Sequence, residues 1–212
     1  MKQILKNRIH TFAREQNGST LVEFAIVIPL LLLFVMGVFE FGRLGYSQAM
    51  AQKATELAAR IATVRPAICP DVPTVFSPAP TNGTEPPRFG TLCRGGGVCA
   101  IPDDAEISCT LDTANATSDE VWTTIVSLLP AGTERRNVEI RYSHDDRLGF
   151  LGGPYTPIVT AELVGLTHQF VTPLGLLAEL ASGNESEIRN SINFPNMSAS
   201  LPAEDLGQGT GL

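Results

Sequence analysis

One long apolar run dominates the pattern of hydrophobic and polar positions along the chain. It occupies residues 24–39 without a charged side chain, and the rest of the sequence holds no comparable stretch. With Leu21 and Val22 included, the run approaches the roughly 20 residues that a helix needs to span a bilayer. The pattern therefore predicts a single membrane-spanning helix near the N-terminus, followed by a polar domain.

The same helix is predicted to continue beyond the membrane, to about residue 64. The segment after Arg43 is rich in good helix formers, alanine above all, and Pro66 is expected to end the helix. Pro29, inside the apolar run, removes one backbone hydrogen bond and is expected to bend or loosen the helix there. One face repeats at helical spacing and is expected to pack on the domain or on neighbouring helices: Met50, Ala51, Ala54, Leu57, Ala58, Ile61 and Ala62.

The polar domain is predicted to add a small antiparallel sheet, which makes the fold α+β. Residues 65–104 are rich in proline and are expected to be irregular, and the chain from Pro202 onward is expected to be a flexible tail. Between them, local patterns predict four strands and two helices. The strands are expected at 105–111, 137–143, 158–170 with a bulge at Gly165, and 193–201 at an edge because of Pro195; the helices are expected at 118–129, with Thr117 as N-cap in a capping box with Glu120, and at 172–180.

Four cysteines follow the predicted helix: Cys69, Cys93, Cys99 and Cys109. An even number in an exported domain predicts two disulfides, which would tether the irregular segment. Free thiols or a zinc site are the alternatives, and the lack of a C-x-x-C pair or a nearby histidine weakens the zinc interpretation. Of the three pairings that four cysteines allow, a tight loop from Cys93 to Cys99 is feasible and would leave Cys69 with Cys109. The other two pairings stay open.

Charge predicts the orientation of the chain. The segment before the apolar run is basic, with Lys2, Lys6, Arg8 and Arg14 against Glu15. Positive flanks stay in the cytoplasm, so the domain is expected on the opposite side of the membrane. The whole chain has a formal net charge of -7 and no clustered basic face. We therefore expect no nucleic-acid partner.

Three interpretations of the N-terminus compete. A conventional signal peptide would have a shorter core and a small-x-small site directly after it, whereas here the core continues into Glu40 and Phe41. A plain signal anchor would have no use for Glu23, because a carboxylate at the edge of a membrane helix is costly and usually has a partner. In the third interpretation, a leader is cut between Gly18 and Ser19, and Glu23 pairs with the new amine of a neighbouring subunit. The alternative for Glu23 is that its side chain merely sits at the headgroup level.

Two motifs carry a resemblance to a known family. They are Gly-Ser-Thr-Leu-Val-Glu-Phe-Ala-Ile-Val-Ile-Pro at 18–29 and Gly-Val-Phe-Glu-Phe-Gly-Arg at 37–43. Together they closely resemble the TadE-like family, pilin-like proteins of the tight-adherence (Flp) pilus systems of bacteria. The resemblance implies cleavage after Gly18 by a prepilin peptidase, and a role as a minor pilin or pseudopilin in pilus assembly and surface adhesion. The implied partners are other pilin-like subunits and the assembly machinery.

The resemblance, the basic N-terminal residues and the local patterns together predict a place in the cell and a division of the chain. The protein is expected to cross the bacterial inner membrane once, with a cytoplasmic N-terminus and a periplasmic domain, or to join an extracellular pilus after assembly. Residues 1–18 would form the basic leader, 19–64 the transmembrane and stalk helix, and 65–212 the disulfide-bonded α+β domain. A membrane-anchored periplasmic binding or adhesion module that does not polymerise is the alternative function.

The sequence shows no arrangement typical of an enzyme. The candidate for metal or acid–base chemistry is His144 with Asp145 and Asp146, in a loop rich in glycine and proline. Adjacent residues on an extended chain point to opposite faces, which favours a solvated turn. No nucleophile has a recognisable base beside it. We therefore expect no catalytic residue, no metal, no cofactor and no small-molecule substrate.

Overall fold

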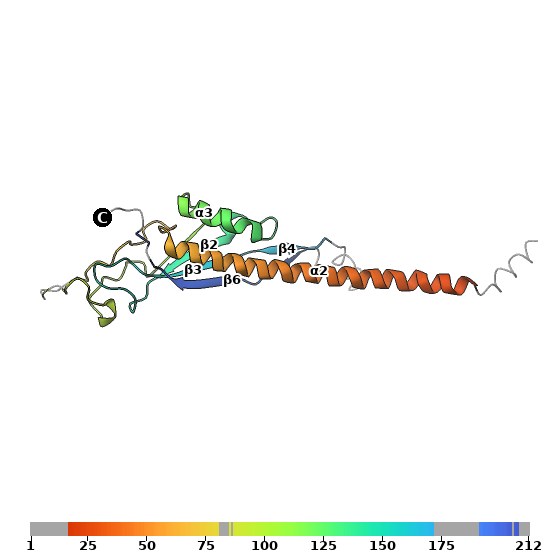
Figure 1. Ribbon diagram of the computed structural model, residues 1–212, viewed down its shortest axis with the longest axis horizontal. Coiled ribbons are helices and arrows are strands. Elements are labelled where there is room, and N and C mark those ends of the chain that lie inside the picture. The colour runs from red at the N-terminus through yellow and green to blue at the C-terminus, as the bar shows by residue number, and fades with distance from the viewer. Residues whose placement is uncertain (1–16, 81–84, 86, 172–190, 205, 208–212) are drawn as a thin grey trace, which may run out of the picture.

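The computed structural model describes residues 17–80, 85, 87–171, 191–204 and 206–207. One helix, α2 (Asn17–Val64), runs through the molecule. Its N-terminal half projects free of the remaining elements, and its C-terminal half lies against a small folded domain (Figure 1). The predicted leader before residue 17 and the predicted helix at 172–180 lie outside the described residues.

The single helix predicted from the sequence is confirmed. It is continuous through Pro29 and ends just before Arg65 and Pro66. At 1.5 Å per residue its 48 residues extend over about 70 Å. The expected loosening at Pro29 stays a prediction.

The small residues of α2 form its contact with the domain. Ala51, Ala54, Ala58 and Ala62 are all fully buried, as is Ala59 between them. This alanine face packs against strands β3 (Ile158–Leu163) and β6 (Met197–Pro202) and against helix α3 (Ala116–Ile125). Because alanine has only a methyl group, the sheet and both helices can approach closely. Of the two partners predicted for this face, the domain of the same chain is the one that the structure shows.

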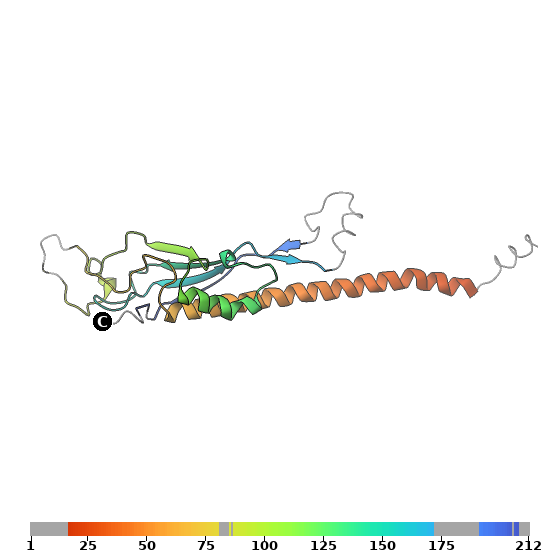
Figure 2. The same cartoon turned by 90° about the horizontal axis from the view of Figure 1, so that it is seen from above.

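The sheet has four antiparallel strands in the order β1-β2-β3-β6. Strands β1 (Glu106–Thr110) and β2 (Val138–Ser143) lie close to their predicted positions. Val138, Ile140 and Tyr142 alternate inward to the core. Helices α2 and α3 lie side by side on this inner face (Figure 2), so the domain has two layers and the predicted α+β architecture is confirmed.

Two predicted strands are each broken in the structure. The strand expected over 158–170 ends at Leu163, because Gly165 has a φ of +65° and turns the chain instead of forming a bulge. The chain then forms β4 (Thr167–Gln169), which pairs with β5 (Ser191–Asn193) in a separate two-stranded sheet, here called the β4–β5 ribbon. The strand expected over 193–201 is likewise interrupted around Pro195, which has no amide hydrogen to donate. Its second part, β6, does lie at a sheet edge.

The prediction of a flexible tail from Pro202 onward is wrong for its first residues. Ala203 and Leu206 are buried in the core. The backbone N–H of Glu204 donates to the carbonyl oxygen of Thr63 at 3.0 Å, which ties this segment to the end of α2. Residues 208–212 lie outside the described part.

The predicted N-cap of α3 is also wrong. Asn115, not Thr117, caps the helix, and its Oδ1 accepts a hydrogen bond from the Ser118 N–H at 2.7 Å. Thr117 lies inside the first turn and is buried. Glu120 forms no capping box; it accepts hydrogen bonds from the Arg65 guanidinium, which lowers the pKa of the Glu120 carboxyl. The α-helix ends at Ile125 and continues as a 3-10 turn, Val126–Leu128.

Replacing Asn115 by alanine is expected to destabilise the domain by about 1–2 kcal/mol. The substitution removes the cap and also the hydrogen bond that Asn115 Nδ2 donates to the Ile68 carbonyl oxygen at 2.8 Å. Urea denaturation followed by Trp122 fluorescence measures the loss. Thr123→Ala, at an exposed position in the same helix, is the matched control and should change stability little. An equal loss in both variants would contradict the capping role.

Two disulfides hold the irregular segment: Cys69–Cys109 and Cys93–Cys99. This is the pairing that the feasible tight loop favoured. Beside the first bond, the Ile68 N–H donates to the buried Tyr142 hydroxyl at 3.0 Å, and burial raises the pKa of Tyr142 to about 12. Where the structure describes it, the segment up to residue 104 otherwise forms bends, a 3-10 turn (Cys93–Gly95) and isolated bridges, as predicted.

Glycines let aromatic rings pack closely at the end of the domain that is remote from the start of α2. The ring of Phe76 lies directly against Gly149 and that of Phe89 against Gly152, where an added Cβ would collide with the ring. Both glycines have φ near +80°, a conformation that other residues rarely adopt. Phe89 still leaves 82% of its surface exposed.

Candidate functional site

The predicted processing and assembly residues lie at the start of α2. The Gly18–Ser19 bond falls in the first turn of the helix. Glu23 lies one turn further along and is exposed, as is Pro29. The four cysteines belong to the other end of the molecule. The predicted processing site and the two disulfides therefore lie in separate regions of the structure.

The N-terminal half of α2 presents apolar side chains to its surroundings all the way round. It is the one helix in the described part of the chain that is long and apolar enough to cross a membrane. An exposed apolar surface of this extent is typical of a membrane or protein contact. The exposed residues include Leu21, Phe24, Ile26, Leu30, Phe34, Val38, Phe39 and Phe41.

The length of this surface fixes where the helix would leave a bilayer. A hydrocarbon core of about 30 Å takes about 20 residues at 1.5 Å each. Counted from Leu21, the far boundary falls at Glu40 and Phe41. The apolar surface and the start of the domain contact therefore meet at these residues.

Glu40 forms a polar cluster at this boundary. Its side chain is 0% exposed. Its Oε1 accepts a hydrogen bond from Arg43 Nη1 at 3.1 Å and another from the Val171 N–H at 3.0 Å. His168 Nε2 lies 3.8 Å from the same oxygen. The cluster fastens the end of the β4–β5 ribbon to α2.

Because Glu40 is fully buried, its hydrogen bonds and its nearby charges determine how much its carboxylate costs the fold. A carboxylate taken out of water is costly unless charges and hydrogen bonds compensate it, and Arg43, 38% exposed, supplies the opposite charge. His168, 4% exposed, packs edge-on against the rings of Phe170 and Phe194. Among the described residues, Glu40 Oε2 and His168 Nε2 have no hydrogen-bond partner.

The sequence predicts Glu40 only as part of the motif at the end of the apolar run, and it does not predict the contacts of Glu40 in the fold. Its contact with Val171 joins positions 131 residues apart. The available signal was the position itself, a lone acid directly after a charge-free apolar run, where a partner is expected on physical grounds.

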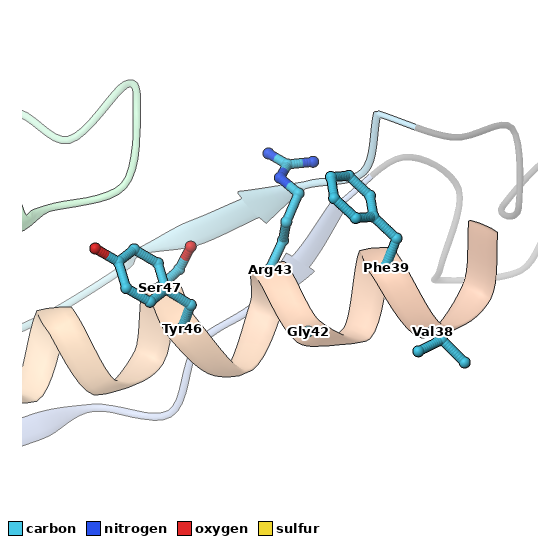
Figure 3. A pocket seen from close by; sticks show the side chains of 6 residues that line it. All are labelled: Val38, Phe39, Gly42, Arg43, Tyr46 and Ser47. Carbon is cyan, nitrogen blue, oxygen red and sulfur yellow. The ribbon is translucent and has the colours of Figure 1, made fainter. Parts of the chain in front are cut away.

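Two shallow grooves flank this cluster. Figure 3 shows the first, along α2, with Arg43 directed toward the ribbon and the rings of Phe39 and Tyr46 on either side of it. The second lies between α2 and β4 and is lined in part by His168, Phe170 and Val171. Arg43 and Ser47 border both grooves.

The loop with His144, Asp145 and Asp146 makes structural contacts. His144 Nδ1 lies 3.2 Å from the Tyr155 hydroxyl, and the two rings are stacked. Burial raises the pKa of Tyr155 to about 12. Asp145 accepts a hydrogen bond from the Arg147 N–H within the turn. Among the residues that the structure describes, no three His, Cys, Asp or Glu side chains lie close enough together to hold a metal ion.

The apolar surface, the buried acid at its end and the alanine face all lie on one continuous helix. Residues 18–60 match the family model of TadE-like proteins. The match covers both motifs that carried the resemblance and confirms it for this part of the chain. No curated protein and no solved structure gives a significant match.

The TadE-like segment coincides with most of α2. It includes Gly18, Ser19, Glu23, Glu40 and Arg43, and it ends before the last turn of the helix. The domain that packs on the helix lies outside the matched residues. The TadE-like family is structural and non-enzymatic, and it points to Tad pilus systems and to association with pilus components. The apolar half of α2 is compatible with anchoring in a membrane.

Proposed function

We propose that this chain is a minor pilin or pseudopilin of a tight-adherence (Flp-type) pilus. A prepilin peptidase would cleave it after Gly18, and the mature subunit would act in pilus assembly and surface adhesion. The observation that carries the proposal is the continuity of α2 within the TadE-like segment. An exposed apolar half passes without interruption into a half that bears the folded domain. Such a helix can exchange lipid for neighbouring helices while the domain stays attached.

Glu23 supplies the charge for this exchange. Cleavage would give Ser19 a free amine, and Glu23 lies one helical turn beyond it. In the proposed assembly, the amine of one subunit pairs with Glu23 of its neighbour, and both charges are neutralised in an apolar setting. The precursor would lie in the inner membrane with its N-terminus in the cytoplasm and its domain in the periplasm, which agrees with the basic N-terminal residues.

A second candidate is a membrane-anchored adhesion module that does not polymerise. The apolar side chains that the disulfide-rich region leaves exposed favour it. Phe89 and Ile101 are more than two-thirds exposed, and Phe150 lies nearby in the same region. A partner could be bound there without assembly into a filament.

The N-terminal residue of the membrane-extracted protein tests the proposed processing. Mass spectrometry is expected to find Ser19 at the N-terminus of the wild type and Met1 retained in Gly18→Leu. A wild type that keeps Met1 would make the chain a plain signal anchor. A start near Arg43 would indicate a conventional signal peptide.

Glu23→Ala separates the two candidates. If the chain polymerises, the variant should be processed and membrane-bound but absent from sheared pili. Glu56→Ala is the matched control, since Glu56 is an exposed acid on the same helix that pairs with Lys53. Wild-type protein that never appears in sheared pili would favour the module that stays in the membrane.

A further inference from the structure

We propose that the end of the β4–β5 ribbon, at Val171, contacts lipid in the leaflet on the side of the folded domain. The protein would then meet the membrane at two places, through α2 and through the ribbon. The inference rests on the membrane anchoring in the proposed function. It adds a contact that lies outside the TadE-like segment.

The contact with Glu40 fixes the position of the ribbon along the axis of α2, and therefore its depth relative to the membrane. The hydrogen bond from the Val171 N–H to Glu40 Oε1 is 3.0 Å long, so Val171 lies at the level of Glu40 on the helix. A bilayer core of about 30 Å that begins at Leu21 ends at this same level. Val171 is therefore held at the boundary between hydrocarbon and headgroups.

The exposed side chains at this level suit that boundary. Val171 is 74% exposed although its backbone is fixed by a fully buried acid. Phe39 and Phe41 are also exposed on the adjacent turn of α2. Arg43 follows beyond them; its side chain is partly exposed, and its guanidinium carries a positive charge that would suit lipid phosphate. An apolar layer with a cation above it is the arrangement of residues that lie in a membrane interface.

Continuity with the membrane helix favours lipid over a second copy of the chain. The ribbon points along α2 toward the helix's apolar half, as both views show (Figures 1 and 2). Any lipid that surrounds Phe39 and Phe41 lies within reach of Val171, whose backbone is bonded to the residue between them. A neighbouring subunit would have to displace this lipid first.

Quenching of single tryptophans by brominated lipid tests the contact. Trp122 is the one tryptophan of the chain, so Trp122→Phe gives a background for three probes in the full-length protein. Val171→Trp reports on the ribbon, Phe34→Trp on the middle of the apolar helix, and Thr160→Trp on the outer face of the sheet. Each variant is reconstituted in phosphatidylcholine vesicles with bromine on the upper part of the acyl chains. Circular dichroism checks that the fold is kept, and Val171 is exposed enough to accept the larger ring.

We expect Val171→Trp to lose about a third or more of its emission, because an interfacial side chain lies about 5–10 Å deep. Phe34→Trp should be quenched as well, and Thr160→Trp should be unaffected. Quenching of Phe34→Trp alone would overturn the ribbon contact and leave the membrane anchoring intact. A blue-shifted but unquenched Val171→Trp would show that protein, a second copy, covers the site, and would equally overturn it. If neither probe is quenched, the proposed anchoring fails together with the inference.

Discussion

Removing the Cys69–Cys109 bond is expected to destabilise the domain by about 4 kcal/mol, against about 2 kcal/mol for the Cys93–Cys99 bond. The difference follows from the chain that each bond closes. The first joins residues 40 positions apart and the second residues 6 positions apart. A longer closed loop removes more freedom from the unfolded chain, so its loss costs more.

The place of the first bond in the fold adds to its effect. It connects the segment that follows α2 to strand β1, where the Ile68 N–H also binds Tyr142 and the Ile68 carbonyl oxygen binds Asn115. Without the bond, these hydrogen bonds and the packing of the core must hold the segment after α2 in place. The Cys93–Cys99 bond lies in an irregular loop beyond the sheet.

Chemical denaturation of the full chain in detergent, followed by Trp122 fluorescence, measures both losses. The double variants Cys69→Ala/Cys109→Ala and Cys93→Ala/Cys99→Ala serve as each other's controls, since each removes one bond and two sulfur atoms. A larger loss for the second pair would show that loop length does not govern the stability of this domain.

Replacing Glu40 by leucine is expected to free the β4–β5 ribbon at a cost of about 3 kcal/mol. The substitution leaves the Val171 N–H without its acceptor and removes the buried charge that faces Arg43 and His168. Glu40→Gln should lose less, because its amide oxygen can still accept from Val171. The alanine face and the four-stranded sheet should keep their structure in both variants.

Hydrogen exchange detects this local release. Amides in residues 166–171 of Glu40→Leu are expected to exchange about 100-fold faster, which corresponds to the 3 kcal/mol above. Amides of β2 and β3 should be unchanged. Glu56→Leu, which removes an exposed acid from the same helix, is the control. Unchanged exchange in the ribbon would show that other contacts hold it.

The features that could be predicted from the sequence are those encoded by local pattern. A charge-free run, alanines at helical spacing and Pro66 define α2, and simple alternation defines β2. The short loop between Cys93 and Cys99 favours their pairing and leaves Cys69 with Cys109. In the helix, in β2 and in the Cys93–Cys99 loop, residues near in sequence decide the structure; the Cys69–Cys109 pair then follows as the remaining one.

The features that could not be predicted depend on distant contacts. Glu40 and Val171 meet only after the sheet has folded back along α2. The sequence pattern does not predict Asn115 as the N-cap of α3. Asn115 is held in this position by a second hydrogen bond, to Ile68, which lies 47 residues earlier in the chain. Two predicted strands are longer than the strands in the structure. Their hydrophobic alternation continues through Gly165 and Pro195, but the backbone changes direction at these residues.

The Cys69–Cys109 bond also has a mechanical consequence. Cys69 lies shortly after the end of α2, and Cys109 lies in the sheet. A pulling force on the later strands therefore reaches α2 through the disulfide, and the 40 residues between the two cysteines bear no load. If this bond were reduced and Cys93–Cys99 stayed intact, that stretch could extend by about 115 Å before it became taut. Oxidation of these two cysteines thus sets how far the sheet can move from α2 under tension.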